Sequence, residues 1–397
     1  MSESIVIVSA VRTPMGGFQG DFTSLAAHDL GGAAIKAALE RAGRGSKLTP
    51  EMVSEVLFGN CLMAGQGQAP ARQAAFKGGL PDSAGAVTLS KMCGSGMSAV
   101  MFAHDMLVAG SHDVLVAGGM ESMTNAPHLL LKGRSGIRIG HDRVMDHMML
   151  DGLEDAYEAG RSMGTFGEDC AAKYGFTRSN QDDFATASVQ RAQAAIKSGA
   201  FEAEITPVAV KTRAGEVQIS IDEGPGKIKL DKIPTLKAAF KKDGTITAAS
   251  SSSINDGAAA MVLMRAGTAA ELGCKPLAKI MAHATHAQAP NWFATAPVGA
   301  TQKVLAKAGW KVEDVDLWEI NEAFAVVPMA LMAELNIPHD KVNVNGGACA
   351  LGHPIGASGA RIIVTLIHAL QARGLKKGVA TLCIGGGEAT ALALELL

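Results

Sequence analysis

The chain has 397 residues, of which 48% are hydrophobic and 4% aromatic, and its 36 basic and 38 acidic residues give a formal net charge of −2 at pH 7. A chain of this kind can bury a large core in roughly two or three domains, and it has no basic excess to attract nucleic acid. No apolar run reaches the ~18 residues that a membrane span needs, so we expect no membrane segment.

The chain begins with a predicted strand at residues 5–8. Because the strand starts so early, we expect no signal or transit peptide. The last three residues, Glu395-Leu396-Leu397, differ from the Ser-Lys-Leu signal that directs proteins to peroxisomes. We therefore expect a cytoplasmic protein.

Two parts of the chain, about 265 residues apart, contain the same series of predicted elements, which indicates a duplicated domain. In each copy a helix leads to a strand, and a glycine-rich turn then opens a second helix that leads to a second strand. The first copy comprises residues 32–43, 53–58, 97–109 and 114–117, and the second comprises residues 298–309, 315–320, 360–372 and 379–384. Alternating strands and helices favour an α/β fold with mostly parallel sheets covered by helices.

A segment of different composition interrupts the first half. It contains several methionines at 145–149 and many charges, and its residues 182–198 fit an amphipathic helix. A segment of this length is too long for a plain loop, so it should have elements of its own over the active-site face. A predicted strand at 258–264 then returns the chain to the first half. The expected domains are 1–121 continued by 250–275, an inserted domain at 122–249, and a second half at 276–397.

The six cysteines are spread along the chain and include no Cys-x-x-Cys pair, so we expect neither a disulfide framework nor a zinc site. Four of them, Cys61, Cys170, Cys274 and Cys349, fit ordinary buried positions. Cys349 is the least clear of the four because it lies four residues before His353.

Cys93 lies in the segment Lys91-Met92-Cys93-Gly94-Ser95-Gly96, between the predicted strand at 87–89 and the helix at 97–109. A thiol at a helix N-terminus is close to the positive end of the helix dipole, which lowers its pKa from ~8.5 and increases the reactive thiolate fraction. We therefore predict that Cys93 is a nucleophile. A buried cysteine at a tight turn is the structural alternative.

Asn321 and Glu322 end a predicted strand at 317–320. The amide of Asn321 could hold a water molecule or donate a hydrogen bond to a developing oxyanion. Glu322 could orient its neighbours or cap the next helix.

His353 lies between Gly352 and Pro354, where the second copy opens its helix. An imidazole with an ordinary pKa of ~6.5 suits a base near neutrality. Cysteine and histidine together form a nucleophile and its base. The alternative is a polar histidine on a surface loop.

Cys383 ends a predicted strand and is followed by Ile384 and by three glycines at 385–387. Consecutive glycines cost folding entropy, and they are easier to explain if their N–H groups face a ligand, as in an oxyanion hole. Cys383 would then exchange a proton with a carbon atom. Two cysteines with separate roles suit a reaction in which one carries an acyl group and the other moves a proton.

Taken together, these segments resemble the thiolase family, from Ile5 to the C-terminus. The motifs that carry the resemblance are Cys93-Gly94-Ser95-Gly96, Asn321-Glu322-Ala323-Phe324, Gly352-His353-Pro354 and Cys383-Ile384-Gly385-Gly386-Gly387. The resemblance implies the thiolase fold, with five layers in the order αβαβα, two related halves and an inserted loop domain. It also implies a homo-oligomer, usually a tetramer in short-chain members.

The resemblance further implies a two-stage transfer between acetyl-CoA molecules. His353 takes the proton of Cys93, which attacks an acyl thioester while the backbone N–H groups of Cys93 and Gly385 hold the oxyanion. Cys383 then removes a proton from the methyl group of a second acetyl-CoA, and His353, with a water held by Asn321, stabilises the enolate. The products are acetoacetyl-CoA and CoA, and no metal or redox cofactor is implied.

By the same resemblance, coenzyme A lies over the inserted domain. Its implied contacts are Leu153, Met163, Lys227, Phe240, Ala248, Ser252, Ala323 and Phe324. Lys227 would meet the nucleotide end, where a cation suits phosphate. Ordinary packing, or a solvated lysine in the case of Lys227, is the alternative for each.

The chain departs from the family pattern at Ser90, Ser162, Ala389 and Ser250–Ser253. Short-chain members commonly have histidine where Ser162 stands, so the preferred acyl length stays open. A broader 3-ketoacyl-CoA thiolase of fatty-acid breakdown is the nearest alternative function. A decarboxylating ketoacyl synthase would not need Cys383. A non-catalytic nucleotide-binding protein is disfavoured because no G-x-G-x-x-G follows the first strand.

Overall fold

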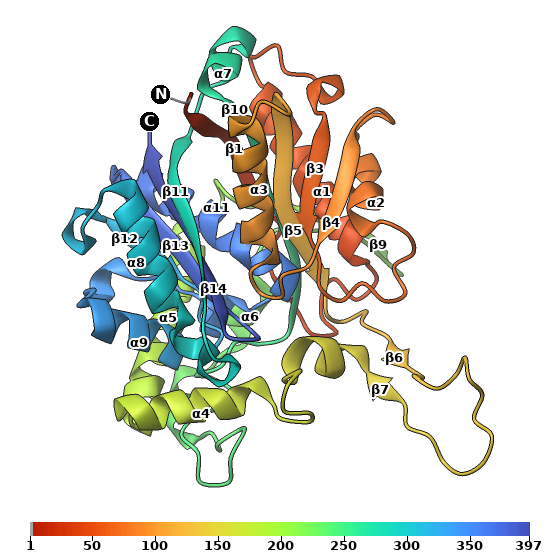
Figure 1. Cartoon of the computed structure of the whole chain (residues 1–397), viewed down its shortest axis with the longest axis vertical. Helices are drawn as coiled ribbons and strands as arrows, with labels where there is room; N and C mark the ends of the chain where they lie inside the picture. Colours follow the sequence, from red (N-terminus) through yellow and green to blue (C-terminus); the bar gives the residue numbers. More distant parts are fainter. Residues whose placement is uncertain (1–2) are drawn as a thin grey trace.

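One continuous, ten-stranded sheet runs through the protein and carries helices on both faces (Figure 1). The computed structural model describes residues 3–397 of the chain. The strands of this sheet are β1 (Ile5–Arg12), β2 (Gly16–Gly17), β3 (Glu55–Gly59), β4 (Gly85–Leu89), β5 (Val114–Ser122), β10 (Asn255–Arg265), β11 (Ala278–Ala287), β12 (Leu317–Ile320), β13 (Lys377–Ile384) and β14 (Glu388–Leu396). Their order is β12-β13-β14-β11-β1-β10-β5-β3-β4, with β2 paired to β10.

The sheet is mixed, so the expectation of mostly parallel sheets is wrong. The pairs β3–β4, β3–β5 and β12–β13 are parallel, as alternating strands and helices predict. The pairs of β10 with β1 and β5, and of β14 with β11 and β13, are antiparallel. In the second half, the glycine turn after β13 leads directly into β14, and a connection this short can only join antiparallel strands.

The two halves of the sheet meet at a narrow junction. Strands β1 and β11 pair at only two positions, Val6 with Lys279 and Ile7 with Ala278. The packing of side chains between the halves must therefore supply most of their association.

The helices form layers on and between the two halves of the sheet. Helices α1 (Ala27–Gly43) and α2 (Pro70–Lys77) pack on the outer face of the first half. Helices α3 (Ser95–Val108) and α11 (Ile355–Arg373) form the middle layer, which contacts strands of both halves. Helix α8 (Ala296–Ala308) covers the outer face of the second half. The two halves of the sheet lie on either side of α3 and α11 and therefore count as two β layers. With the outer helices, the layers follow the order α, β, α, β, α, which confirms the predicted architecture.

Helix α11 is long and apolar enough to cross a membrane by length and composition alone, although the sequence showed no continuous apolar run of that length. Within the protein, 83% of this stretch is buried. A helix that packs against other elements all round its circumference is apolar all round. Its place in the middle layer therefore accounts for its composition.

The chain leaves the sheet after β5 and returns to it at β10. The elements between them are β6 (His128–Leu129), β7 (Met145–Asp146), a π-helical turn (Met149–Leu153), α4 (Met163–Tyr174), α5 (Arg178–Ser198), β8 (Val208–Thr212), β9 (Gly215–Ile219) and α6 (Glu223–Lys227). The helix predicted over 182–198 starts one turn earlier, because the Thr177 hydroxyl accepts a hydrogen bond from the Asn180 N–H at 3.2 Å and caps it. Shorter helices elsewhere are α7 (Ala266–Leu272), α9 (Val326–Leu335) and α10 (Ala348–Leu351).

Candidate active site

Cys93 lies on the turn that joins β4 to α3, two residues before the helix begins. The preceding residue, Met92, has a φ of +46°, in the left-handed region that side chains rarely adopt. Ser95 holds this turn: its hydroxyl accepts from the Lys91 N–H at 2.8 Å and donates to the Met92 carbonyl at 2.6 Å. The half-buried sulfur of Cys93 is thereby fixed on the wall of a cavity.

The Cys93 thiol is protonated at neutral pH. Burial raises its pKa to about 11, although the N–H groups of Gly385 and of Cys93 itself act in the opposite direction. The predicted lowering by the helix N-terminus is therefore wrong, because the loss of water around the thiolate outweighs the favourable backbone dipoles. A base must take the proton when Cys93 reacts.

His353 is buried at the start of α11 and is oriented by Ser358. The Ser358 hydroxyl lies 2.5 Å from His353 Nδ1 and donates its own proton to the Pro354 carbonyl at 2.9 Å. It must therefore accept from Nδ1–H, which leaves Nε2 as the unprotonated nitrogen. Among the described residues, Nε2 has no hydrogen-bond partner, so it is available as a proton acceptor.

Burial, and then the nearby charge of Arg361, lower the pKa of His353 to about 3. The expectation of a base that titrates near neutrality is thus wrong, since the sequence could not show how completely this loop is enclosed. The preceding residue, Gly352, has a φ of +97°, and a β-carbon there would collide with the Asn255 side chain. Only glycine lets the loop bring His353 to this position.

Cys383 is buried at the end of β13, on the wall of the same cavity as Cys93 and His353. Burial, and then the proximity of Cys93, raise its pKa well above the ordinary value. Of the glycines that follow, Gly386 and Gly387 have φ values of +95° and +86° and form the turn into β14. Gly385 instead directs its N–H toward the Cys93 sulfur.

Asn321 follows β12 and is completely buried. Its backbone N–H donates to the Thr381 carbonyl at 3.0 Å, but neither atom of its side-chain amide has a partner among the described residues. A buried polar group without a partner is uncommon in folded proteins and needs an explanation. Asn321 does not line the cavity that contains Cys93, His353 and Cys383.

Glu322 has a structural role. Its carboxylate accepts hydrogen bonds from the Ser188 hydroxyl at 2.7 Å, the Asn343 amide at 2.7 Å and the Cys349 N–H at 2.9 Å. Of the two alternatives drawn from the sequence, the orienting role is therefore confirmed. The alternative, that Glu322 caps the next helix in the chain, is wrong for α9. The helical N–H group bound by Glu322 is that of Cys349, which belongs to α10.

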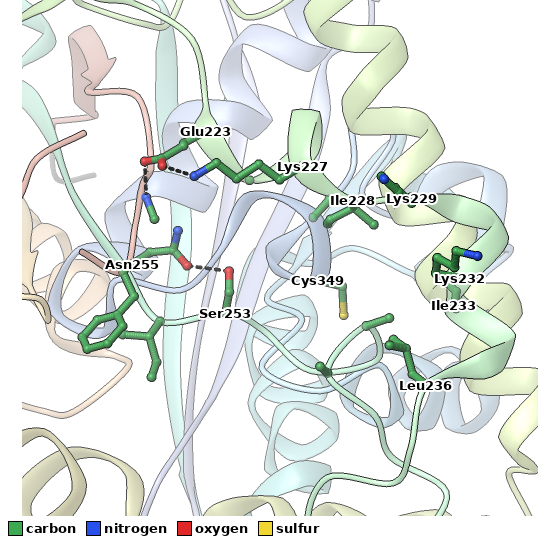
Figure 2. Close-up of a pocket in the computed structure, with 17 residues that line it drawn as sticks. Glu223, Lys227, Ile228, Lys229, Lys232, Ile233, Leu236, Ser253, Asn255 and Cys349 are labelled. Atoms are coloured by element: carbon green, nitrogen blue, oxygen red, sulfur yellow. Dashed lines mark hydrogen bonds and ion pairs between the residues drawn. The ribbon is translucent and has the colours of Figure 1, made fainter. Parts of the chain in front are cut away.

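Three adjoining cavities lead from the predicted catalytic residues to the surface. The innermost, of about 70 Å³, is lined by Cys93, His353, Cys383 and Gly385 together with Leu153, Met163, Ser252, Ala323 and Phe324. The next, of about 280 Å³, shares Leu153, Met163, Ser252, Phe324 and His353 with the first and adds Phe240 and Ser162. An outer cleft of about 550 Å³ shares Ser253 and Ile254 with the second cavity and contains Ala248 and Lys227 (Figure 2).

Each of the eight residues proposed from the sequence to contact coenzyme A lines one of these cavities. Lys227 is exposed in the outer cleft and pairs with Glu223, so part of its charge is neutralised (Figure 2). Lys229 and Lys232, which sequence reasoning missed, lie in the same cleft. Their spacing after Lys227 was a signal that could have identified them.

Sequence reasoning also missed Ser358, which lies five residues after His353 and orients it. In the inner cavity it missed Phe293 and Ile355, which have no sequence signal beyond their apolar character. Among the described residues, one cluster of potential metal ligands, His104, Asp105 and His283, lies apart from these cavities.

The comparison with known families defines the class of protein. The models of the thiolase N-terminal and C-terminal domains match residues 5–267 and 274–396, respectively. The chain therefore belongs to the thiolase family, a class of acyl-transferring enzymes, as the resemblance predicted.

Individual relatives match over almost their whole length. An acetyl-CoA acetyltransferase of Chromobacterium violaceum is 51% identical over 393 residues, which cover 98% of this chain and 99% of the relative. One of Cupriavidus necator is 49% identical with the same coverage.

Two solved structures share the fold. The acetyl-CoA acetyltransferase of Bacillus anthracis superposes with a TM-score of 0.96 at 40% identity and covers 100% of this chain and 99% of its own. A thiolase of Ascaris suum in complex with coenzyme A superposes with a TM-score of 0.93 at 41% identity and covers 100% of both chains.

Proposed function

We propose that the protein is an acetyl-CoA C-acetyltransferase that condenses two molecules of acetyl-CoA to acetoacetyl-CoA and CoA, reversibly, through an acetyl-cysteine. The observation that carries the proposal is the convergence of Cys93, Cys383, His353 and the Gly385 N–H on one cavity of about 70 Å³. Relatives that are 49% and 51% identical over almost the whole chain bear this name, which supports the same conclusion.

In the first stage Cys93 becomes acetylated. Its sulfur attacks the thioester carbon as His353 Nε2 takes its proton, and the N–H groups of Cys93 and Gly385 stabilise the oxyanion. The carbon–sulfur bond to CoA then breaks, and Cys383 gives its proton to the departing CoA thiolate. The site is left with acetyl-Cys93, a protonated His353 and a Cys383 thiolate.

These two charged groups are the base and the acid that the second stage needs. The raised pKa of Cys383 makes its thiolate a strong base, which removes a proton from the methyl group of the second acetyl-CoA. The protonated His353, with a water held by the Asn321 amide, stabilises the enolate oxygen. The enolate carbon then attacks acetyl-Cys93, and the released Cys93 thiolate recovers its proton from His353. All three groups return to their starting states.

The size of the inner cavity favours a short acyl group. At about 70 Å³ it is much smaller than the two adjoining cavities of about 280 and 550 Å³. A longer acyl chain would require Leu153, Met163 or Phe293 to move. The broader 3-ketoacyl-CoA thiolase is therefore the second candidate.

Mass spectrometry tests the covalent intermediate. The protein is mixed with acetyl-CoA, denatured in acid and digested, and the acetyl group is expected on Cys93 alone. The Cys93→Ala variant serves as the control and should carry no acetyl group. Absence of acetylation on Cys93 in the wild type would contradict the mechanism and favour a protein that binds nucleotides without catalysis.

The acyl-length preference needs a separate experiment. Rates of thiolysis are compared for acetoacetyl-CoA and for 3-ketoacyl-CoA substrates of increasing length. We expect kcat/KM to fall by about tenfold or more for each of the first added two-carbon units, because each must displace cavity side chains. A preference for long chains would favour the role in fatty-acid breakdown.

We also propose a homotetramer in the cytoplasm, with CoA as a substrate and product and with no cofactor in the reaction. The segment between β6 and β7 projects from the body of the protein (Figure 1) and exposes apolar side chains, including Leu131 at 64% and Ile139 at 97%. Such a patch is typical of a contact between subunits. Light scattering should give four times the chain mass of 40.8 kDa, and a lower mass for the Leu131→Asp/Ile139→Asp double variant. Cell fractionation tests the compartment.

A further inference from the structure

We propose that His104, Asp105 and His283 form a binding site for one divalent transition-metal ion of the zinc type, remote from the catalytic cavity. His104 and Asp105 lie near the end of α3, and His283 lies on β11. None of the three lines the cavities that contain the catalytic residues.

The distances between the potential ligand atoms fit a single ion. Asp105 Oδ1 lies 3.0 Å from His104 Nδ1 and 2.9 Å from His283 Nε2, and the two nitrogens lie 3.3 Å apart. Ligands bound about 2.0–2.1 Å from one ion in tetrahedral or octahedral geometry lie roughly 3.0–3.4 Å from one another. Two imidazoles and one carboxylate are a set that zinc and related ions accept, with further positions left for water.

A β-bulge brings His283 to this position. The pairing of β11 with β14 shifts by one residue between Ile280 and Ala282. Ile280 packs in the middle layer, whereas Ala282 and Met281 pack on the opposite face, against the α8 side. Without the bulge, alternation would place Ala282 beside α3 and His283 away from it. Bulges often re-aim a side chain in this way at functional sites.

An ion at this site would connect the two halves of the protein. Helix α3 belongs to the first half and β11 to the second, and the two halves of the sheet pair at only two positions. An ion that binds only the folded protein stabilises it by mass action. We therefore assign the ion a structural role and no part in the reaction at Cys93.

Calorimetric titration of the full-length protein with CoCl₂ and ZnCl₂ tests the proposal. The protein is first freed of metal with a chelator and alkylated with iodoacetamide, so that the catalytic thiols cannot bind the ion. We expect one equivalent to bind, a rise in the melting temperature with ZnCl₂, and a visible spectrum of protein-bound Co²⁺.

The variants Asp105→Asn and His283→Gln should each bind at least about tenfold more weakly, since each removes one of three ligands. The control His286→Gln lies on the same strand but faces α8, and it should bind as the wild type does. Equal affinity of the wild type and Asp105→Asn, or no binding by the wild type, would overturn the proposal. The cluster would then be two imidazole N–H groups that share one carboxylate oxygen. If His283→Gln does not fold, the near-isosteric Asp105→Asn decides alone.

Discussion

Corresponding strands in the two halves of the protein are each followed by an asparagine, and the two asparagines have different surroundings. Asn60 follows β3 and Asn321 follows β12. The amide of Asn60 donates to Glu121 Oε1 at 2.6 Å, whereas the amide of Asn321 has no partner among residues 3–397. The first half thus uses this amide to hold Glu121, whereas the second half leaves the amide without a partner among the described residues.

The strands that pair with β3 and β12, namely β5 and β13, also carry corresponding residues that differ. Gly59 pairs with Gly119 across β3 and β5, and Ile320 pairs with Thr381 across β12 and β13. Two residues further along, Glu121 therefore corresponds to Cys383.

Glu121 and Cys383 have different surroundings. The Glu121 carboxylate accepts from the N–H groups of Cys61, Leu62 and Gly356 at 2.9–3.1 Å, and burial raises its pKa to about 7. One copy of the fold thus holds the turns around the site with a carboxylate, while the other places a thiol and the Gly385 N–H in the cavity.

Of the Glu121 and Cys383 pair, Cys383 should give the largest effect, in the variant Cys383→Ala. We expect condensation of acetyl-CoA to fall by about 10³–10⁴-fold, because the proton of the methyl group loses its base. The measurement is the steady-state rate of acetoacetyl-CoA formation. Cys274→Ala, at a buried cysteine remote from the site, is the control and should retain the wild-type rate. Full condensing activity in Cys383→Ala would instead indicate a decarboxylating synthase.

The asparagine pair gives the sharpest contrast. Asn321→Ala should lower kcat by about 10²-fold, since it removes one donor to the enolate, and should leave the melting temperature nearly unchanged. Asn60→Ala should lower the free energy of unfolding by about 1–3 kcal/mol, because Glu121 loses a buried partner, and should leave kcat nearly unchanged. Rates and denaturant unfolding are measured on both variants. Equal effects of the two substitutions on rate would show that the halves do not differ as described.

A smaller effect is expected at Ser358, which positions the imidazole without touching the substrate. Ser358→Ala should lower the rate of Cys93 acetylation by about tenfold, the equivalent of one lost hydrogen bond. Ser358→Thr keeps the hydroxyl and should restore most of the rate. A positioning role predicts that KM for acetyl-CoA does not change, and a large rise in KM in Ser358→Ala would contradict it.

The smallest change is expected on mild acidification. His353 accepts a proton only when neutral, and its pKa of about 3 keeps it neutral well below the usual range. The rate of Cys93 acetylation should therefore vary by no more than about twofold between about pH 7 and pH 5. Rapid-quench measurements of Cys93 acetylation across this pH range test the prediction. A fall in the acetylation rate below about pH 6.5 would contradict it and show that the imidazole is hydrated.

The lowered pKa of His353 also predicts how the stability of the protein depends on pH. An unfolded chain binds a proton at this histidine below pH ~6.5, whereas the folded chain does not until the pH approaches the lowered pKa. The contribution of His353 to stability is therefore present above pH ~6.5 and declines as the pH falls from there toward 3. Denaturant titrations of the wild type and of His353→Asn at several pH values isolate this contribution.

Local sequence was enough to predict the elements that carry the site. The glycine turn before α3, the loop before α11 and the glycine turn after β13 each combine turn residues with a strand or helix of clear periodicity. The ionisation states were not predictable in the same way, because the burial of Cys93 and His353 depends on segments far away in the chain. The sheet also departed from the simple α/β expectation, since β10 and β14 return antiparallel only after a long insertion or a tight turn.

The enclosure of α11 has a consequence for how the chain is made. A ribosome synthesises this helix late, after most of the strands and helices that surround it, and of these only β13 and β14 follow it in the chain. The apolar helix can therefore pack against α3 and the first half of the sheet soon after it emerges, and β13 and β14 then complete its enclosure. A circular permutant that puts α11 first should aggregate more during expression, even if the finished molecule is equally stable.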